Sequence, residues 1–393
     1  MKKVITLILT VVMVFSCLTA FAGCGNNEKN TADSTVIKIG GIGPLTGSYA
    51  NYGTSVKKGA EIAVDEINKA GGVNGYTFEL TFLDSEADSD KAVAAYGKLL
   101  DGGMQISLGA TFSGPTASVV AANDENGLLL LTPSASAKAS IEGSDCAFRV
   151  CFNDPSQGAV SARFVAENKL ATKVAILYQS DLDYSTGLVE TFKETASEVN
   201  LEIVKEVYFQ TGAVDYSSQI DSIVASGADF VFLPIYAADA AIFLTQAKEN
   251  AALDNVVYFG CDGLDGILGQ LDEHPEYAEN VMMLTPFSAD AEDELVQNFV
   301  TSYKQIHNEI PDQFAADGYD AIYVIAEAIK EAEIKSGNEL SKDEFNQALI
   351  SAMTKITVTG VTGTMTWTAD GETTKDAKAM IIKDGVATLY KGE

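Results

Sequence analysis

Residues 36–83 read VIKIGGIGPLTGSYANYGTSVKKGAEIAVDEINKAGGVNGYTFELTFL, and the order of elements in this stretch indicates the fold class. It begins with a short β-rich run at 36–42. An amphipathic helix is expected over 52–72, because apolar side chains recur there every three or four positions. These side chains are Val56, Ala60, Ala63 and Ile67. Two glycines end the helix and an alternating strand follows at 77–83. A strand, a helix and a second strand in this order are typical of a parallel α/β sheet.

The same alternation continues as far as residue 260. Further strands are expected at 105–110, 128–133, 173–178, 201–209, 229–235 and 255–260. Helices are expected between them, at 89–103, 114–127, 156–168, 186–199, 216–226 and 238–250. Residues 290–353 have an almost wholly helical pattern, and two strand-like segments at 356–367 and 377–390 follow. Two α/β series and a returning tail predict two Rossmann-like lobes with parallel-rich sheets, whose ligands bind outside the carboxyl ends of the strands.

The composition narrows the possible functions. A chain of 393 residues, 47% of them hydrophobic, is long enough for two packed domains. Its formal net charge of −29 argues against binding to nucleic acid or to an anionic membrane surface, because both require a basic face. The two histidines, His274 and His307, match no zinc spacing. The sequence therefore predicts no metal site and no imidazole-based catalysis.

The chain begins with the layout of a secretory signal. Residues 1–23 contain two lysines, an apolar run and small residues, and the run is too short for a spanning helix. Cys24 follows Phe-Ala-Gly and is expected to carry the lipid of a bacterial lipoprotein, with residues 24–35 as a solvated tether. The alternative is ordinary cleavage after residues 20–22, which gives a secreted or periplasmic protein. In both cases the protein works outside the cytoplasmic membrane, and with the lipid it is anchored at the extracellular face.

Three cysteines remain in the body of the chain: Cys146, Cys151 and Cys261. Cys146 and Cys151 are close enough in sequence to form a disulfide, but two free buried thiols are an equally good interpretation. Cys261 is expected to face the interior of its lobe as a small apolar residue.

Two motifs suggest phosphate and calcium sites, and neither meets the requirements of its class. GGIGPLTG at 40–47 has the wrong glycine spacing for a dinucleotide-binding loop, and Pro44 prevents direct entry into a helix. DSEADSD at 84–90 has Ser89 where a calcium loop needs glycine and Ala95 where it needs glutamate. These acids are better explained as caps of the helix that begins near residue 89.

Small polar residues follow two strands and suggest a site for an anion. Ser113 lies between a strand and a helix, where it is expected to be the N-cap, with free backbone N–H groups behind it. Residues 132–137, TPSASA, follow the next strand and again combine small hydroxyl side chains with backbone donors. The topology can make these two strand ends neighbours, and two such donor sets side by side suit a carboxylate.

A second strand end, YFGCDGLDG at 258–266, presents a cysteine and two aspartates. No GxSxG motif accompanies it, and Cys261 next to Asp262 lacks a general base, so thiol catalysis is not expected. Asp262 can instead face a cleft as the partner of a ligand cation. Asp265 is expected to cap or solvate the short helix after it.

The opening block at 43–95 resembles the leucine/isoleucine/valine-binding protein family, the solute-binding components of ABC importers for amino acids. LTPSASA, DYSTGL, FLPIYAADAAIFLTQAKE, GYDAIYVIAEAI and GTMTWTADGE extend the similarity, in the family's order, over nearly the whole mature chain. The resemblance implies a type I periplasmic binding protein fold, with two lobes, three crossings between them and a ligand cleft at their junction. It places one lobe at 36–156 plus 286–362 and the other at 157–285 plus 363–393.

The resemblance also implies a set of ligand-binding residues. In the family the ligand carboxylate is held at the positions that match Ser113, Ser134, Ala135 and Ser136, largely by backbone donors. An acid at the position of Asp262 faces the ligand ammonium. Aromatic side chains line the cleft at the positions of Tyr52, Tyr184, Tyr236 and Phe314. The best-known member has a glutamate in place of Asp262 and a disulfide cysteine in place of Phe112, so the ammonium geometry here differs from that member's.

The expected function is therefore that of an extracellular solute-binding component of an ABC importer, monomeric and without cofactor or catalytic activity. It is expected to close on a branched-chain or other hydrophobic amino acid and then to dock on the permease subunits. An aromatic amino acid, an amide or a urea-like compound is the alternative ligand. A secreted hydrolase is the alternative from a different class.

Overall fold

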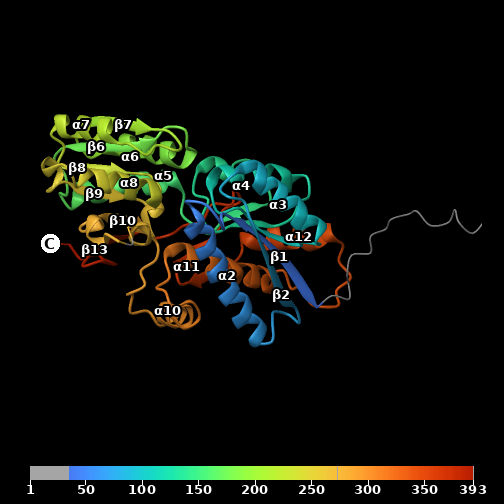
Figure 1. The fold of residues 1–393 in the computed structure, drawn as a ribbon. Coiled ribbons are helices and arrows are strands. Elements are labelled where there is room, and N and C mark those ends of the chain that lie inside the picture. Colours follow the sequence, from blue (N-terminus) through green and yellow to red (C-terminus); the bar gives the residue numbers. More distant parts are fainter. Residues whose placement is uncertain (1–34, 272, 393) are drawn as a thin grey trace, which may run out of the picture.

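The computed structural model describes residues 35–271 and 273–392 of the chain. The predicted signal sequence, the lipidation at Cys24 and the tether as far as residue 34 lie outside the described residues. Figure 1 shows two lobes, each built around a sheet with helices packed against it. The predicted class, two α/β lobes with parallel-rich sheets, is confirmed.

Lobe 1 has a sheet of parallel strands in the order β2-β1-β3-β4-β5. Its strands are β1 (Val36–Gly43), β2 (Thr77–Asp84), β3 (Ile106–Leu108), β4 (Leu130–Thr132) and β5 (Ala147–Arg149). Its helices are α2 (Ala50–Lys69), α3 (Ser89–Asp101), α4 (Ser113–Asp124), α10 (Glu294–His307), α11 (Gln313–Glu331) and α12 (Lys342–Met353). Helices α3 and α4 share one apolar cluster with the sheet, whereas α2, α10, α11 and α12 share another, so the helices cover the sheet on both faces.

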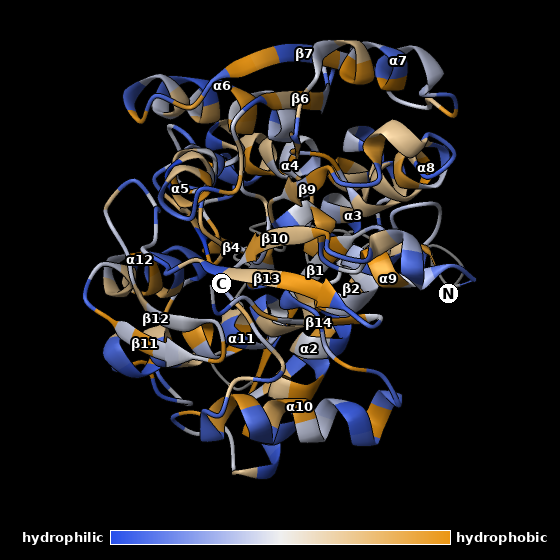
Figure 2. Ribbon diagram, turned by 90° about the vertical axis from the view of Figure 1, so that its left-hand side faces the viewer, coloured by the Kyte–Doolittle hydropathy of each residue, from blue (hydrophilic) through white to orange (hydrophobic). Residues whose placement is uncertain are grey.

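Lobe 2 has a sheet in the order β14-β13-β10-β9-β8-β6-β7. Its parallel strands are β6 (Val174–Gln179), β7 (Ile203–Phe209), β8 (Phe230–Leu233), β9 (Val257–Gly260) and β10 (Met282–Thr285). The returning tail adds β13 (Lys378–Lys383) and β14 (Val386–Leu389), which are antiparallel to their neighbours. The helices are α5 (Asp154–Glu167), α6 (Asp183–Glu198), α7 (Ser217–Ser226), α8 (Ala237–Ala247) and the short α9 (Ile267–Gln270). Figure 2 shows β13 as a hydrophobic strand and α10 as an outer helix of mixed character.

The chain crosses between the lobes three times: from β5 to α5, from β10 to α10, and from the hairpin of β11 (Thr357–Gly360) and β12 (Gly363–Thr366) to β13. The boundary expected between residues 362 and 363 falls inside this hairpin. Met365 and Trp367 are buried in the core of lobe 1, and the Trp367 indole donates a hydrogen bond of 2.8 Å to the Arg149 carbonyl. The second strand of the hairpin therefore packs with lobe 1, and the chain reaches lobe 2 only after it.

Helices α2 and α11 lie side by side in lobe 1 (Figure 1) and approach each other at two glycines. A Cβ atom on Gly59 would lie 1.8 Å from the Ala315 carbonyl oxygen, and one on Gly318 would lie 2.3 Å from the Val56 carbonyl oxygen. Both contacts are with backbone, which cannot move aside without moving a helix. The two glycines therefore set the distance between the helices, and with it the positions of both N-terminal turns at the junction of the lobes.

Gly59→Ala should lower the free energy of unfolding by about 2–3 kcal/mol, because the new methyl group forces these helices apart. Gly97→Ala is the matched control, since Gly97 lies within α3 and a Cβ atom there meets no atom within 4 Å. Helix propensity alone should make that control neutral or more stable by about 0.5–1 kcal/mol. Urea denaturation measures both changes. Equal stabilities for the two variants would contradict the close helix contact.

Candidate functional site

A small pocket lies between the lobes, at the carboxyl ends of strands from both sheets. Lobe 1 contributes Thr111, Phe112, Ser134, Ser136 and Phe314, and lobe 2 contributes Tyr184, Tyr236, Asp262 and Gly263. The pocket has a volume of about 10 Å³, which is room for about one water molecule. A larger molecule can enter only if the lobes part or the rings move.

Six of the nine residues expected at the site line this pocket: Ser134, Ser136, Tyr184, Tyr236, Phe314 and Asp262. Ser113, Ala135 and Tyr52 are buried but do not line it. The Tyr52 ring contacts three of the lining rings, those of Phe112, Tyr236 and Phe314. The sequence reasoning did not select Thr111, Phe112 or Gly263 as site residues. Phe112 and Gly263 are adjacent to the expected residues Ser113 and Asp262, and Thr111 lies two positions before Ser113. Their position at a strand end was the only signal that could have indicated them.

On the lobe 1 side, the two loops that follow β3 and β4 are neighbours, as expected. The Ser134 hydroxyl donates to the Thr111 carbonyl (2.8 Å), and the Ala137 N–H donates to the Ser113 hydroxyl (3.2 Å). The prediction that Ser113 is the N-cap was wrong by one position, because Phe112 has the extended backbone of the cap and Ser113 is the first helical residue. Helix α4 therefore begins at the end of the loop after β3, and the N–H groups of its first turn have no acceptor within the helix.

A buried arginine stabilises the loop after β4. The Arg149 guanidinium is fully buried and donates to the carbonyl oxygens of Ala135, Ser136 and Ala137 at 2.6–3.1 Å. Its Nη2 also lies 3.1 Å from a carboxylate oxygen of Glu372, on the third crossing. These bonds fix the loop with its carbonyl oxygens turned toward Arg149. The positive charge of Arg149 next to the loop favours binding of an anion there.

Aromatic rings from both lobes close the pocket. Tyr236 stacks on Phe112 of lobe 1 with ring centroids 4.6 Å apart and on Tyr184 of lobe 2 with centroids 4.9 Å apart. Phe314 meets Tyr52 edge to face at 4.7 Å. Stacked and edge-to-face pairs at these separations are favourable geometries. The rings form a continuous apolar wall around the polar groups.

Tyr52 joins the lobes by its hydroxyl group. This group, carried by α2 of lobe 1, donates to the Gly263 carbonyl (2.7 Å) and accepts from the Ala237 N–H (2.8 Å), both in lobe 2. The side chain is fully buried. Tyr52 therefore stabilises the closed arrangement of the lobes, and opening must break both bonds.

Asp262 is the acid of the pocket. Its Oδ1 accepts hydrogen bonds from the Tyr184 hydroxyl (2.8 Å) and the Gly263 N–H (2.9 Å). Gly263 is required here, because a Cβ atom would lie 2.5 Å from the Tyr184 hydroxyl oxygen. Burial raises the pKa of Asp262 to about 6, although these hydrogen bonds act in the opposite direction. The carboxylate is thus held in place but desolvated, and no ion pair forms on it within the described residues.

A second acid close to the pocket was not predicted. Asp154, in the first turn of α5 where the chain enters lobe 2, is fully buried, and neither carboxylate oxygen has a hydrogen-bond partner within the described residues. Burial raises its pKa well above the ordinary value, and repulsion from Asp262 adds to this. In sequence it resembles an ordinary acidic residue at a helix start, which gives no sign of its surroundings.

The other acids and cysteines that the sequence singled out lie outside the small pocket. Asp88 caps α3 by accepting from the Lys91 N–H, as expected for the DSEADSD segment. Cys146 and Cys151 are free and buried, so the disulfide alternative is wrong, and Cys261 faces the interior of lobe 2. Asp265 accepts from the Gly266 N–H, as a residue at the start of a short helix can, but it also reaches across the junction to the Gln313 N–H (2.8 Å) of α11.

Two α/β lobes that enclose a polar pocket with an aromatic wall define a two-lobed small-molecule binding protein. A family model described as Periplasmic binding protein matches residues 36–386, and the chain belongs to this family. The family consists of solute-binding proteins rather than enzymes, and membership implies a location in the periplasm or outside the cell. Within residues 35–271 and 273–392, no helix is both long enough and apolar enough to span a bilayer.

Individual relatives carry more specific names. The leucine-, isoleucine-, valine-, threonine- and alanine-binding protein of Pseudomonas aeruginosa is 29% identical over 75% of this chain and 78% of its own length. Leu/Ile/Val-binding protein homolog 3 of Brucella melitensis is 33% identical over 58% of this chain and 61% of its own length. The crystal structure of a branched-chain amino acid transporter substrate binding protein from Streptococcus pneumoniae, in complex with isoleucine, has a TM-score of 0.81 and 29% identity. The match between the two structures covers 90% of this chain and 99% of the Streptococcus pneumoniae chain.

The raised pKa of Asp262 predicts a specific dependence of stability on pH. The Asp262 carboxylate binds a proton more tightly in the folded protein than in the unfolded chain. The loss of stability caused by the buried negative charge is therefore greatest above pH 6 and disappears as the pH falls toward 4. The difference between about 6 and 3.8 corresponds to roughly 3 kcal/mol, at about 1.4 kcal/mol per pKa unit. Asp262→Asn should therefore be more stable than the wild type at pH 8, by about 2–3 kcal/mol, and equally stable at pH 4.

Urea denaturation of both proteins at the two pH values, without ligand, measures this difference. Asp221→Asn, at an exposed position of α7, is the control and should follow the wild type at both values. If Asp262→Asn were less stable than the wild type at pH 8, Asp262 would be a stabilising structural residue rather than a desolvated charge.

Proposed function

We propose that this protein is the solute-binding component of an ABC importer and binds a branched-chain or other hydrophobic amino acid between its lobes. One observation carries the proposal: a desolvated carboxylate, Asp262, lies in one small pocket with the serine loops of the opposite lobe. An amino-acid zwitterion has complementary charges for both ends of such a pocket. The names of the relatives above support the same ligand class.

In the proposed complex, the α-carboxylate lies at the start of α4 and the loop at 134–136. Backbone N–H groups and the Ser136 hydroxyl donate to it, and Arg149 holds the loop from behind. The Ser134 hydroxyl keeps its bond to the Thr111 carbonyl and joins this loop to the loop after β3. The α-ammonium lies against Asp262 and takes the place of the water that would otherwise solvate that carboxylate. Charge-assisted hydrogen bonds of this kind contribute on the order of 1.5–3 kcal/mol each in a water-excluded site.

The apolar side chain of the ligand packs against the aromatic wall. Because the closed pocket has room for about one water molecule, binding begins from an open form in which Tyr236 and Phe112 are separated. Closure then brings Asp262, Tyr184 and Tyr236 onto the ligand bound to lobe 1. Binding is a population shift toward the closed form, which is the form that docks on the permease subunits.

The proposal extends to the cellular arrangement. The lipid on Cys24 anchors a monomer to the extracellular face of the cytoplasmic membrane, where residues 24–35 allow it to reach the permease. The N-terminal sequence supports the anchor, and the name of the Streptococcus pneumoniae structure, a branched-chain amino acid transporter substrate binding protein, supports a transporter partner.

An aromatic amino acid is a second candidate ligand, and the ring cluster favours it. Tyr49, Tyr52, Phe112, Tyr184, Tyr236 and Phe314 form a connected set of ring contacts around the pocket. An aromatic side chain could take the place of Tyr236 between its two stacking partners. The main-chain contacts of the ligand would be the same for both candidates.

A thermal-shift screen of the mature protein against all amino acids tests the proposal. The preferred ligand at one hundred times its dissociation constant should stabilise the protein by about 2.7 kcal/mol, which raises the melting temperature by several degrees. L-Leucine is compared with 4-methylpentanoate, which lacks the ammonium, and 3-methylbutylamine, which lacks the carboxylate. Both analogues should give little or no shift. A flat response to every amino acid, or an equal response to 4-methylpentanoate, would contradict the proposal.

A further inference from the structure

A second, much larger cavity lies next to the candidate amino-acid pocket, on the same junction between the lobes. Its volume is about 530 Å³, which is within the usual range for small-molecule sites. Its walls come from α2 and the loop before α11 in lobe 1, and from α9, β10, β13 and β14 in lobe 2. Residues 265–269 and 309–312 line it, whereas Asp262, Gly263 and Phe314 line the smaller pocket.

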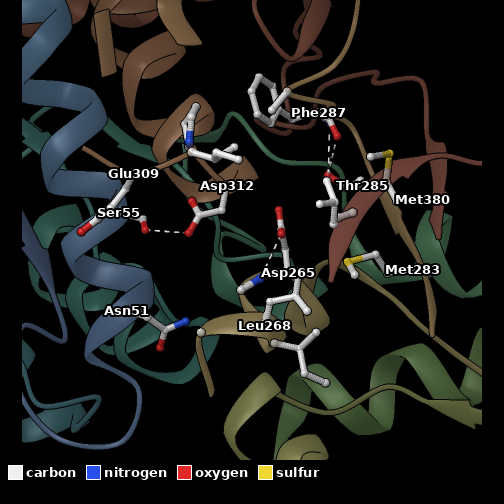
Figure 3. Close-up of a pocket in the computed structure, with 18 of the residues that line it drawn as sticks. Asn51, Ser55, Asp265, Leu268, Met283, Thr285, Phe287, Glu309, Asp312 and Met380 are labelled. Atoms are coloured by element: carbon white, nitrogen blue, oxygen red, sulfur yellow. Dashed lines mark hydrogen bonds between the residues drawn. The ribbon is translucent and has the colours of Figure 1, made fainter. Parts of the chain in front are cut away.

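Two carboxylates from opposite lobes face this cavity. Figure 3 shows Asp265 and Asp312 near its middle, with Met283 and Met380 on one side and Asn51 on the other. Asp312 accepts from the Ser55 hydroxyl (2.6 Å) and the Ala315 N–H (2.9 Å), and Asp265 accepts from the N–H groups of Gly266 and Gln313. Every one of these donors is neutral. Burial raises the pKa of Asp265 to about 7 and repulsion from Asp312 contributes, so a cation between the two groups would be stabilising.

The remaining charges leave the cavity acidic. Glu309 and Lys58 also line it, and they pair with each other at 2.5 Å. The cavity is therefore lined by three carboxylates, those of Asp265, Asp312 and Glu309, and by one ammonium group, that of Lys58. The ammonium group already pairs with Glu309. The balance favours a ligand with a positive charge.

The rest of the lining indicates an organic cation rather than a metal ion. Met283, Met380, Leu268 and Ile382 form an apolar wall, and the exposed apolar side chains of Ile310 and Val386 border the cavity. Both polar atoms of the Asn51 amide are shielded from solvent and have no hydrogen-bond partner within the described residues, and the amide lies at the cavity wall in Figure 3. Among the described residues, no group of three or more metal-ligating side chains is found.

We propose that this cavity is a second ligand site, separate from the amino-acid pocket, which binds an organic cation with an apolar body. The ammonium group of such a ligand lies between the carboxylates of Asp265 and Asp312, and Asn51 offers it a further acceptor. The alkyl or aryl body lies against the methionines of β10 and β13. The inference does not depend on the proposed function, because it rests on different residues and a different ligand.

Calorimetric titration of the mature protein with n-hexylammonium at pH 8.5 tests this proposal. Hexylammonium should bind at one site, 1-hexanol should bind at least tenfold more weakly, and hexanoate should not bind measurably. Asp265→Asn and Asp312→Asn should each weaken hexylammonium at least tenfold, since both substitutions keep a hydrogen-bond acceptor and asparagine still caps α11. Circular dichroism melting verifies that the variants fold, and Asp221→Asn is the exposed control.

The outcomes separate this site from the amino-acid pocket. Hexylammonium binding that survives in Asp262→Asn supports the second site, whereas binding lost there but kept in Asp265→Asn assigns the amine to the amino-acid pocket and overturns the inference. No binding by the wild type, or equal binding of 1-hexanol, also overturns it. If hexylammonium binds as expected but no amino acid does, the proposed function fails while the second site stands.

Discussion

The most consequential physical feature of this structure is that it buries carboxylates between its lobes with few cations to balance them. One of these acids has its own counter-charge: Asp317 lies 2.7 Å from the Lys375 ammonium, and both side chains are fully buried. Asp154 and Asp262 have no such partner within the described residues. A buried charge costs free energy unless it is paired, so closure of the lobes without a ligand is opposed at this point. In the proposed function the ammonium group of the ligand removes that cost, and closure then depends on the ligand.

The contacts that hold the lobes together explain why this cost can be tolerated. The Tyr52 hydroxyl forms hydrogen bonds with two backbone groups of the other lobe. Asp265 accepts a hydrogen bond from the first N–H of α11, and the Tyr49 hydroxyl donates one to Asp239 at 3.0 Å. All of them depend on α2 or α11, whose separation is set by backbone contacts at glycine. The helix pair of lobe 1 therefore positions the polar groups that meet lobe 2. The aromatic wall then excludes water from Asp262.

Much of the fold could be predicted because its signals are local. Hydrophobic periodicity located the strands and helices, and the alternation of elements implied that the loops after β3 and β4 would meet. Position at a strand end indicated Asp262. The contact from Asp265 to Gln313 could not be predicted, because these residues are 48 positions apart and meet only when the lobes close. The unpaired state of Asp154 and the second cavity also depend on how the lobes pack. The resemblance placed a lobe boundary between residues 362 and 363, within the hairpin of β11 and β12, and the sequence of this segment does not reveal the core on which Met365 and Trp367 pack.

The central claim is that Asp262 is the counter-charge for a ligand ammonium. Isothermal titration calorimetry of the preferred amino acid tests it most directly, with wild type, Asp262→Asn and Ser113→Ala compared at pH 8. The account predicts a loss of affinity of about a hundredfold or more in Asp262→Asn, equivalent to roughly 3 kcal/mol, without loss of folding. Ser113→Ala should lose tenfold or less, because the backbone donors remain. Unchanged affinity in Asp262→Asn would contradict the account.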